Sequence, residues 1–171
     1  MLGSGNLSVN KNMWSVTPSI GELVAASAPA LFARFGDHPL SPELVGEAVL
    51  AATEISVVET AKVADTDPFS LKPQGTNEWQ REIQTRGGFR TVAAAHKPLI
   101  VVRFRLFENE FKLAGRHQSR VDLWEEGNRR FGPVQEVVLP RASNATEIGE
   151  AMINIAKSCK SVFGSVFSEE R

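Results

Sequence analysis

Hydrophobic residues recur every three or four positions in the first third of the chain, which predicts helices there. The first helix is expected to begin at Thr17 and Pro18, because threonine caps helices and proline suits the first helical position. Pro29 is expected to kink or split this helix, since proline lacks an N–H, and Gly36 is expected to end it. Residues 1–15 are rich in Gly, Ser and Asn and are expected to be an irregular lead-in.

A second helix is expected after the same start signal, in which Ser41 is followed by Pro42. Its predicted buried stripe follows the helical spacing and comprises Leu44, Val45, Ala48, Val49 and Ala52. Alternation of side-chain types then predicts a strand over residues 55–63. The Asp-, Pro- and Gly-containing segment 65–77 is expected to be a loop.

From residue 79 to residue 139, alternating polar and apolar side chains predict an antiparallel meander. The clearest strand covers residues 99–107, where Phe104 faces one side while Arg103 and Arg105 face the other. A tight turn at residues 108–109 is expected to follow this strand. The other expected strands cover residues 79–84, 89–95, 110–113, 121–124 and 134–139.

The last part of the chain has the strongest helical pattern. Asn144 and Glu147 form a capping signature, and apolar residues keep helical spacing from Ile148 to Val166. The elements together predict an α+β fold, in which an antiparallel sheet of about five or six strands packs against two N-terminal helices and a long C-terminal helix. Residues 16–171 are expected to form a single α+β domain.

Composition places the chain among ordinary globular proteins, because 42% of its 171 residues are hydrophobic and 23% are charged. Cys159 is the single cysteine, which excludes an internal disulfide and a zinc site built from several thiolates. The N-terminus lacks the basic and apolar regions of a secretory signal, and no apolar run approaches the roughly 20 residues of a membrane helix. A cytoplasmic protein is therefore expected.

Charge is sorted along the chain although the net charge is only −1. Residues 20–80 carry nine acidic and three basic side chains, whereas residues 81–130 carry eleven basic and six acidic ones. The two groups either face each other and solvent, or leave an exposed acidic surface that docks into a basic cleft of a partner. The near-neutral total removes the simplest argument for a nucleic-acid binder, and no membrane partner is expected.

Candidate catalytic and cofactor-binding residues are sparse. His38, His96 and His117 lack the spacing of a metal-ligand set, so structural roles are predicted for all three. Cys159 falls on an apolar helical stripe and is predicted to be a buried, inert thiol. The sequence contains neither a G-x-S-x-G motif nor a P-loop, and no metal or other cofactor is expected.

One enzymatic alternative remains open, a small metal-dependent nuclease or phosphoesterase. Glu110 and Lys112 form a Glu-x-Lys element, in which the carboxylate helps to hold Mg²⁺ and the lysine positions the attacking water. Asp65 or Asp67 would supply the second carboxylate, and His117 an acid or base.

The acidic first half, the meander from Trp79 to Leu139 and the amphipathic closing helix together resemble the immunity proteins of bacterial polymorphic-toxin and contact-dependent-inhibition systems. This resemblance implies a non-enzymatic protein that binds and neutralises one cognate toxin, often a nuclease. The acidic residues expected to contact the basic surface of such a toxin are Asp37, Glu43, Glu47, Glu54, Asp65, Asp67 and Glu78.

A third hypothesis is a homodimeric structural or chaperone-like module. Its interface would be the apolar stripe of the closing helix, which is long and strongly amphipathic. The sequence pattern does not fix the oligomeric state.

Overall fold

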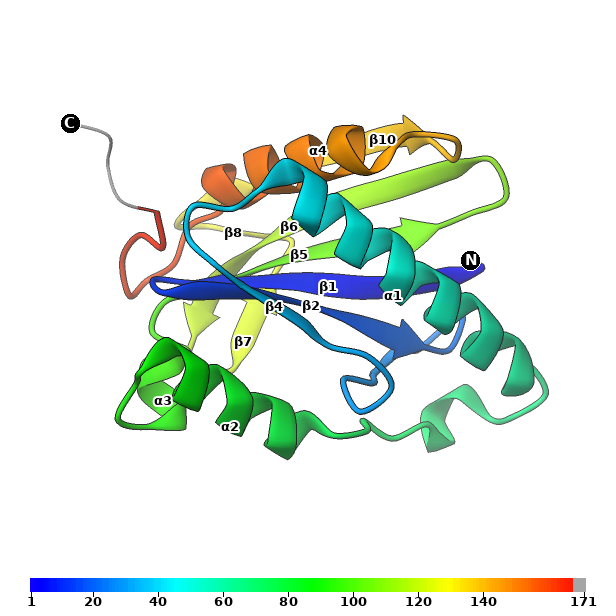
Figure 1. The fold of residues 1–171 in the computed structure, drawn as a ribbon, viewed down its shortest axis with the longest axis horizontal. Helices are drawn as coiled ribbons and strands as arrows, with labels where there is room; N and C mark the ends of the chain where they lie inside the picture. Colours follow the sequence, from blue (N-terminus) through cyan, green and yellow to red (C-terminus); the bar gives the residue numbers. More distant parts are fainter. Residues whose placement is uncertain (168–171) are drawn as a thin grey trace.

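The computed structural model describes residues 1–167, so residues 168–171 of the predicted domain lie outside the described part (Figure 1). Its strands are β1 (Gly3–Asn10), β2 (Met13–Ile20), β3 (Ala26–Ser27), β4 (Arg34–Asp37), β5 (Leu99–Leu106), β6 (Glu110–Arg120), β7 (Leu123–Glu125), β8 (Gly127–Asn128), β9 (Gly132–Pro133) and β10 (Glu136–Pro140). Its helices are α1 (Pro42–Lys62), the 3₁₀ turn η1 (Pro68–Ser70), α2 (Thr76–Gly87), α3 (Val92–Ala95) and α4 (Ala145–Ser158).

Within residues 1–167, eight strands form one antiparallel sheet with the order β10-β6-β5-β1-β2-β3, in which β4 also pairs with β2 and β7 with β6. The strands β8 and β9 form a separate hairpin. This architecture confirms the predicted α+β class, the antiparallel sheet and the long C-terminal helix. The predicted 99–107 strand, its turn and the following strand are β5 and β6.

The helices α1 and α4 lie side by side on one face of the sheet (Figure 1). Because side chains alternate along a strand, this face takes every second residue, and Leu7, Val16 and Phe104 are fully buried there. The intervening residues face the other way, where α2 packs against Met13 of β2. The sheet thus separates the main core from a smaller cluster around α2.

The two N-terminal turns of α1 and α4 approach each other at backbone distance. A Cβ atom added to Gly46 would collide with the backbone of Ala145, and one added to Gly149 would collide with the backbone of Pro42. Glycine at both positions lets the helices share one layer. The capping box of Asn144 and Glu147, predicted from the sequence, holds the start of α4 at this crossing.

The structure corrects the expectation for the N-terminal third of the chain. Residues 1–15 are not an irregular lead-in but form β1 and the first part of β2, and the expected helix from Thr17 to Gly36 is replaced by β2, β3 and β4. Alternation in β1 was masked because its outward positions are serine and asparagine, residues typical of loops. Asn10 ends β1 and accepts hydrogen bonds from the backbone N–H groups of Asn12 and Met13, which closes the hairpin.

Three expected strands are helices. Residues 55–63 continue α1, residues 79–84 lie in α2, and residues 89–95 contain α3. In α1 the buried stripe continues through hydroxyl residues: Ser56 accepts a hydrogen bond from the backbone of Ser4, and Thr60 from that of Gly21. Polar residues on the buried side hid the helical period, which is why the second half of α1 was assigned to a strand.

Two smaller corrections concern helix surfaces and ends. Leu44, expected in the buried stripe of α1, is 43% exposed, while its other four members are buried. The closing helix ends at Ser158 rather than at Val166, and Cys159 is its C-terminal cap.

We expect Gly149→Ala to lower the free energy of unfolding by about 2 kcal/mol, although alanine is the better helix former, because its methyl group has no space at Pro42. Urea denaturation measures this change. The matched control is Glu150→Ala at the exposed neighbouring position, which should change stability by less than about 0.5 kcal/mol. Equal stability of Gly149→Ala and the unsubstituted chain would contradict the close helix crossing.

Candidate functional site

The structure places all seven acidic residues predicted to contact a partner at the exposed surface. Three of them, Glu43, Glu47 and Glu54, lie on α1, and Asp65 and Asp67 lie in the segment that follows its C-terminal end. The other two lie on different elements: Asp37 ends β4, and Glu78 is in the first turn of α2. Most of the predicted set therefore belongs to α1 and the loop after it.

The outer face of α1 combines charge with exposed apolar surface. Glu47 and Glu54 are seven residues apart, so they project from the same side of the helix. Leu44 and Val58 flank them and are 43% and 55% exposed. We call Leu44, Glu47, Glu54 and Val58 the α1 outer stripe. The stripe therefore presents both apolar and negatively charged side chains at one surface.

The acidic residues differ in the interactions that their side chains make within the chain. Glu43 lies in the first turn of α1, where its charge favours the helix dipole. Asp67 caps η1, because its Oδ1 atom accepts a hydrogen bond of 3.0 Å from the backbone N–H of Phe69. By contrast, Glu47, Glu54 and Glu78 make no side-chain hydrogen bond or ion pair within the described residues. These three carboxylates are free to contact a partner.

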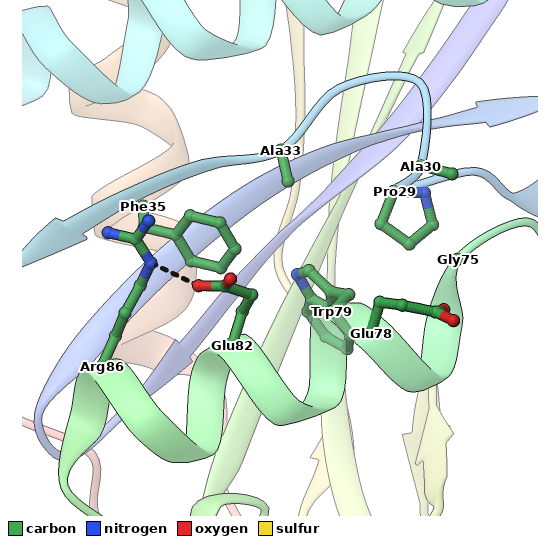
Figure 2. Close-up of a pocket in the computed structure, with 9 residues that line it drawn as sticks. All are labelled: Pro29, Ala30, Ala33, Phe35, Gly75, Glu78, Trp79, Glu82 and Arg86. Carbon is green, nitrogen blue, oxygen red and sulfur yellow. Dashed lines mark hydrogen bonds and ion pairs between the residues drawn. The ribbon is translucent and has the colours of Figure 1, made fainter.

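A pocket of about 350 Å³ lies beside Glu78, between α2 and the segment that leads into β4 (Figure 2). Figure 2 shows Trp79 rising from α2 toward this segment, with Phe35 at one end of the pocket and Pro29 at the other. Its nine lining residues are Pro29, Ala30, Ala33, Phe35, Gly75, Glu78, Trp79, Glu82 and Arg86. The pocket is therefore mainly apolar with charged groups along the α2 side.

The charges that line the pocket are unequally compensated. The Nε atom of Arg86 lies 2.8 Å from Oε2 of Glu82, and its guanidinium group lies 4.6 Å from the centre of the Phe35 ring. Arg86 and Glu82 thus satisfy each other, whereas Glu78 has no cationic neighbour within ion-pair distance in the described chain. Aromatic rings beside a free carboxylate suit a cationic side chain with an apolar stem, such as lysine or arginine.

Sequence reasoning identified Glu78 but missed the pocket. Trp79 and Phe35 were assigned to a strand and to a helix respectively, and the pocket forms because they belong instead to α2 and β4. The sequence signal that could have indicated a helix here is a glycine at each end of α2. Gly75 precedes Thr76 and Gly88 follows Gly87, and both adopt the left-handed backbone conformation.

Two buried residues, Ser15 and His96, contact the Trp79 side chain on the side of the sheet. Its indole N–H donates a hydrogen bond of 3.0 Å to Ser15 of β2, and its ring centre lies 6.3 Å from that of His96. His96 in turn lies against Trp124, whose indole N–H donates to the carbonyl of Leu99. Burial lowers the pKa of His96 below its ordinary value, because an imidazolium would lose its hydration there.

The structure does not bring together the four residues of the nuclease hypothesis. Asp67 caps η1, which Figure 1 shows well apart from the β5–β6 hairpin that carries Glu110 and Lys112. Glu110 and Lys112 pair with each other, and His117 accepts a hydrogen bond from the backbone N–H of Lys160. Among residues 1–167, no group of three or more His, Cys, Asp or Glu side chains is placed to hold a metal ion.

The apolar stripe proposed as a dimer interface is used within the chain. Ile148, Met152 and Ile155 of α4 are fully buried against α1 and the sheet. Cys159 is half-buried, and burial raises the pKa of its thiol to about 11, which disfavours the reactive thiolate. In the described part of the chain, no helix has the length and hydrophobicity that a membrane span requires.

Comparison with known proteins shows a likeness of fold rather than of sequence. A scan against protein-family models gives no match, and a search of curated protein sequences gives none. Among solved structures, a chain of the CdiA-CT/CdiI toxin and immunity complex from Yersinia pseudotuberculosis has a TM-score of 0.71 and 16% identity, with 92% of this chain and 97% of that chain covered. The expected resemblance to toxin immunity proteins is confirmed at the level of the fold.

A second solved structure, a protein of unknown function from Neisseria meningitidis, is equally similar. Its TM-score is 0.70 at 15% identity, and the alignment covers 92% of this chain and 94% of that chain. Both likenesses extend over nearly the whole length of the chains.

We expect the stability of the chain to fall as the pH is lowered through about 6.5, the ordinary pKa of histidine. Because the pKa of His96 is lowered by folding, the unfolded chain binds more protons than the folded chain in this range, and the linkage disfavours the folded state. The decrease in unfolding free energy between pH 7.5 and pH 5 should be smaller in His96→Gln. An NMR titration in which the His96 ring protonates at or above its ordinary pKa would contradict this prediction.

Proposed function

We propose that this chain is an immunity protein that binds and neutralises a cognate toxin of the contact-dependent-inhibition type. The observation that carries the proposal is the whole-length likeness of fold to a chain of a toxin and immunity complex. A protein that inhibits a toxin by binding to it requires an accessible, rigid surface, and it does not require catalytic groups. The α1 outer stripe and the pocket beside Glu78 offer such surfaces.

Charge supports a basic toxin surface as the partner of these elements. The free carboxylates of Glu47, Glu54 and Glu78 are exposed, and opposite charges on two proteins raise their rate of association. Many toxins of this class are nucleases, and a nuclease needs a positively charged cleft to hold its substrate. Carboxylates that occupy such a cleft exclude nucleic acid from it, which gives a simple mechanism of neutralisation in the cytoplasm.

The first test pairs this chain with a candidate toxin domain, chosen from the products of any reading frames that adjoin its own gene. We expect growth arrest when that domain is expressed alone, and normal growth when this chain is expressed with it. Size-exclusion chromatography of the mixed purified proteins should show one stoichiometric complex. Growth arrest that persists beside folded, abundant chain would contradict the proposed function.

The second test reverses three of the unpaired carboxylates in Glu47→Lys/Glu54→Lys/Glu78→Lys. We expect the association rate with the toxin to fall at least about tenfold at low ionic strength, with a weaker dependence on salt, because steering is lost. Surface plasmon resonance at several salt concentrations measures both quantities.

The matched control for charge is Glu108→Lys/Asp122→Lys/Glu150→Lys, which reverses three exposed acids outside the predicted contact set. It should keep the association rate within about twofold. Equal effects of the two variants would show that net charge, rather than the α1 outer stripe and the α2 pocket, governs association.

A further inference from the structure

The face of the sheet opposite α1 and α4 is polar and positively charged. Its β1–β2 half carries hydroxyl and amide side chains, namely Ser4, Asn6, Ser8, Ser15, Thr17 and Ser19, of which all but Asn6 are buried and Ser15 is hydrogen-bonded to Trp79 of α2. Its β5–β6 half consists of cationic side chains, namely Arg103, Arg105, Lys112 and Arg116. We call these ten residues the cationic sheet face.

Strand register brings the two halves together. Directly paired residues of antiparallel strands point to the same side of a sheet, and Ser4 is paired both with Ser19 on β2 and with Arg105 on β5. Arg105 is in turn paired with Lys112 on β6. A row of two hydroxyl groups and two cations therefore crosses four strands without an acidic residue. The next row carries Asn6 beside Arg103 in the same way.

The cations on this face are close to one another and poorly neutralised. The pKa of Arg103 is lowered by burial and by the charges of Arg116 and Arg105, and Glu126 only partly opposes this effect. The Nη2 atom of Arg116 lies 3.8 Å from Oε1 of Glu126, a long ion pair. Neither Arg103 nor Arg105 forms an ion pair with any described residue.

Several polar atoms of this face are buried and lack a hydrogen-bond partner in the described chain. They are Oγ of Ser4, Nε of Arg105 and Nε of Arg116. Ser4 is 1% exposed and is therefore out of reach of a ligand, whereas the side chain of Arg116 is 29% exposed. Two of the three groups are donors only and the third can donate, so what they lack is an acceptor. An unsatisfied buried donor disfavours the unbound state, and a ligand that brings acceptors to the two arginines removes this cost on binding.

We propose that the cationic sheet face binds an acidic segment of the partner protein, with its carboxylates on Arg103, Arg105 and Arg116. That this partner is the toxin rests on the proposed function. That the face binds carboxylates rests on its own residues and does not depend on the proposed function. Arginine recognises carboxylates through paired N–H donors, and three arginines on this face lie near one another.

A protein segment fits this face better than a nucleic acid does. Phe104, the aromatic residue between Arg103 and Arg105, lies on the opposite side of the sheet. The ring of Phe107, beyond the end of β5, is already covered by Lys112, whose Nζ atom lies 4.9 Å from the ring centre. The arginines of β5 therefore have no aromatic ring between them on which a base can stack. Glu110 and Glu126 border the cations and repel an extended polyanion. A short segment with a few carboxylates fits between these borders.

The test titrates hexaglutamate peptide into ¹⁵N-labelled protein at low ionic strength and follows the arginine Nε–Hε signals by NMR. We expect the signals of Arg103, Arg105 and Arg116 to shift, and the peptide affinity to fall at least about tenfold in Arg103→Gln/Arg105→Gln, about 1.4 kcal/mol. The matched control is Arg129→Gln/Arg130→Gln, which removes the same charge from two exposed arginines between β8 and β9 and should keep the affinity within about twofold.

Other outcomes overturn the proposal. Shifts confined to Arg129 and Arg130, or no saturable binding, would show that the face does not recognise carboxylates. A dT₁₀ oligonucleotide that shifts the same three arginines at lower concentration than hexaglutamate would assign the face to nucleic acid instead. The signals of the unsubstituted protein decide these cases, so the proposal stays testable even if the double variant does not fold.

The growth assay separates this proposal from the proposed function. Hexaglutamate binding without protection against the toxin would leave the cationic sheet face as a carboxylate site and remove the immunity function. Protection against the toxin without hexaglutamate binding would support the immunity function and remove the carboxylate site. If both hold, Arg103→Gln/Arg105→Gln should weaken the toxin complex more than Arg129→Gln/Arg130→Gln does.

Discussion

The close crossing of α1 and α4 is the constraint on which the arrangement of the surface depends. Gly46 and Gly149 allow each helix backbone to touch the other, so both helices fit within one layer on the sheet. This packing turns Val45 and Val49 into the core. Because successive residues on an α-helix are about 100° apart, Glu47 then faces solvent. The outward face of α1 is thus set by a contact on its inward side, and a partner meets a surface that a large core holds rigid.

The same two-residue period of the strands gives the sheet two unlike faces. One accepts the helices and is apolar, whereas the other carries hydroxyl, amide and guanidinium groups that no helix of the described chain covers completely. Burying an arginine without a partner costs free energy, so a face of this composition is not what stability alone would select. The hydroxyl rows of β1 and β2 are buried, and Ser15 accepts a hydrogen bond from Trp79 of α2, so the arginines of β5 and β6 are the part of this face that the proposed recognition uses.

How far the sequence predicts this structure depends on what fills the outward positions. The β5–β6 hairpin and the cap at Asn144 were predictable, because arginines alternate with large apolar residues in β5 and the capping box is a local signal. The strands β1 and β2 were not, since their outward serines and asparagines are typical of loops, and only tertiary pairing makes them strands. The acidic residues were predictable as exposed, but the pocket beside Glu78 required knowing that Trp79 lies on a helix.

An acidic surface and a basic surface on different elements together restrict which partners can bind more than either surface does alone. The α1 outer stripe lies on the helical side of the sheet and the cationic sheet face on the other, so the chain presents opposite charges in opposite directions. A partner that complements both must carry basic and acidic regions at a matching separation, and one rotated by half a turn places like charges together. Since juxtaposed like charges cost several kcal/mol, this arrangement rejects partners that match only one surface. The net charge of −1 therefore conceals acidic and basic side chains that lie on different sides of the sheet.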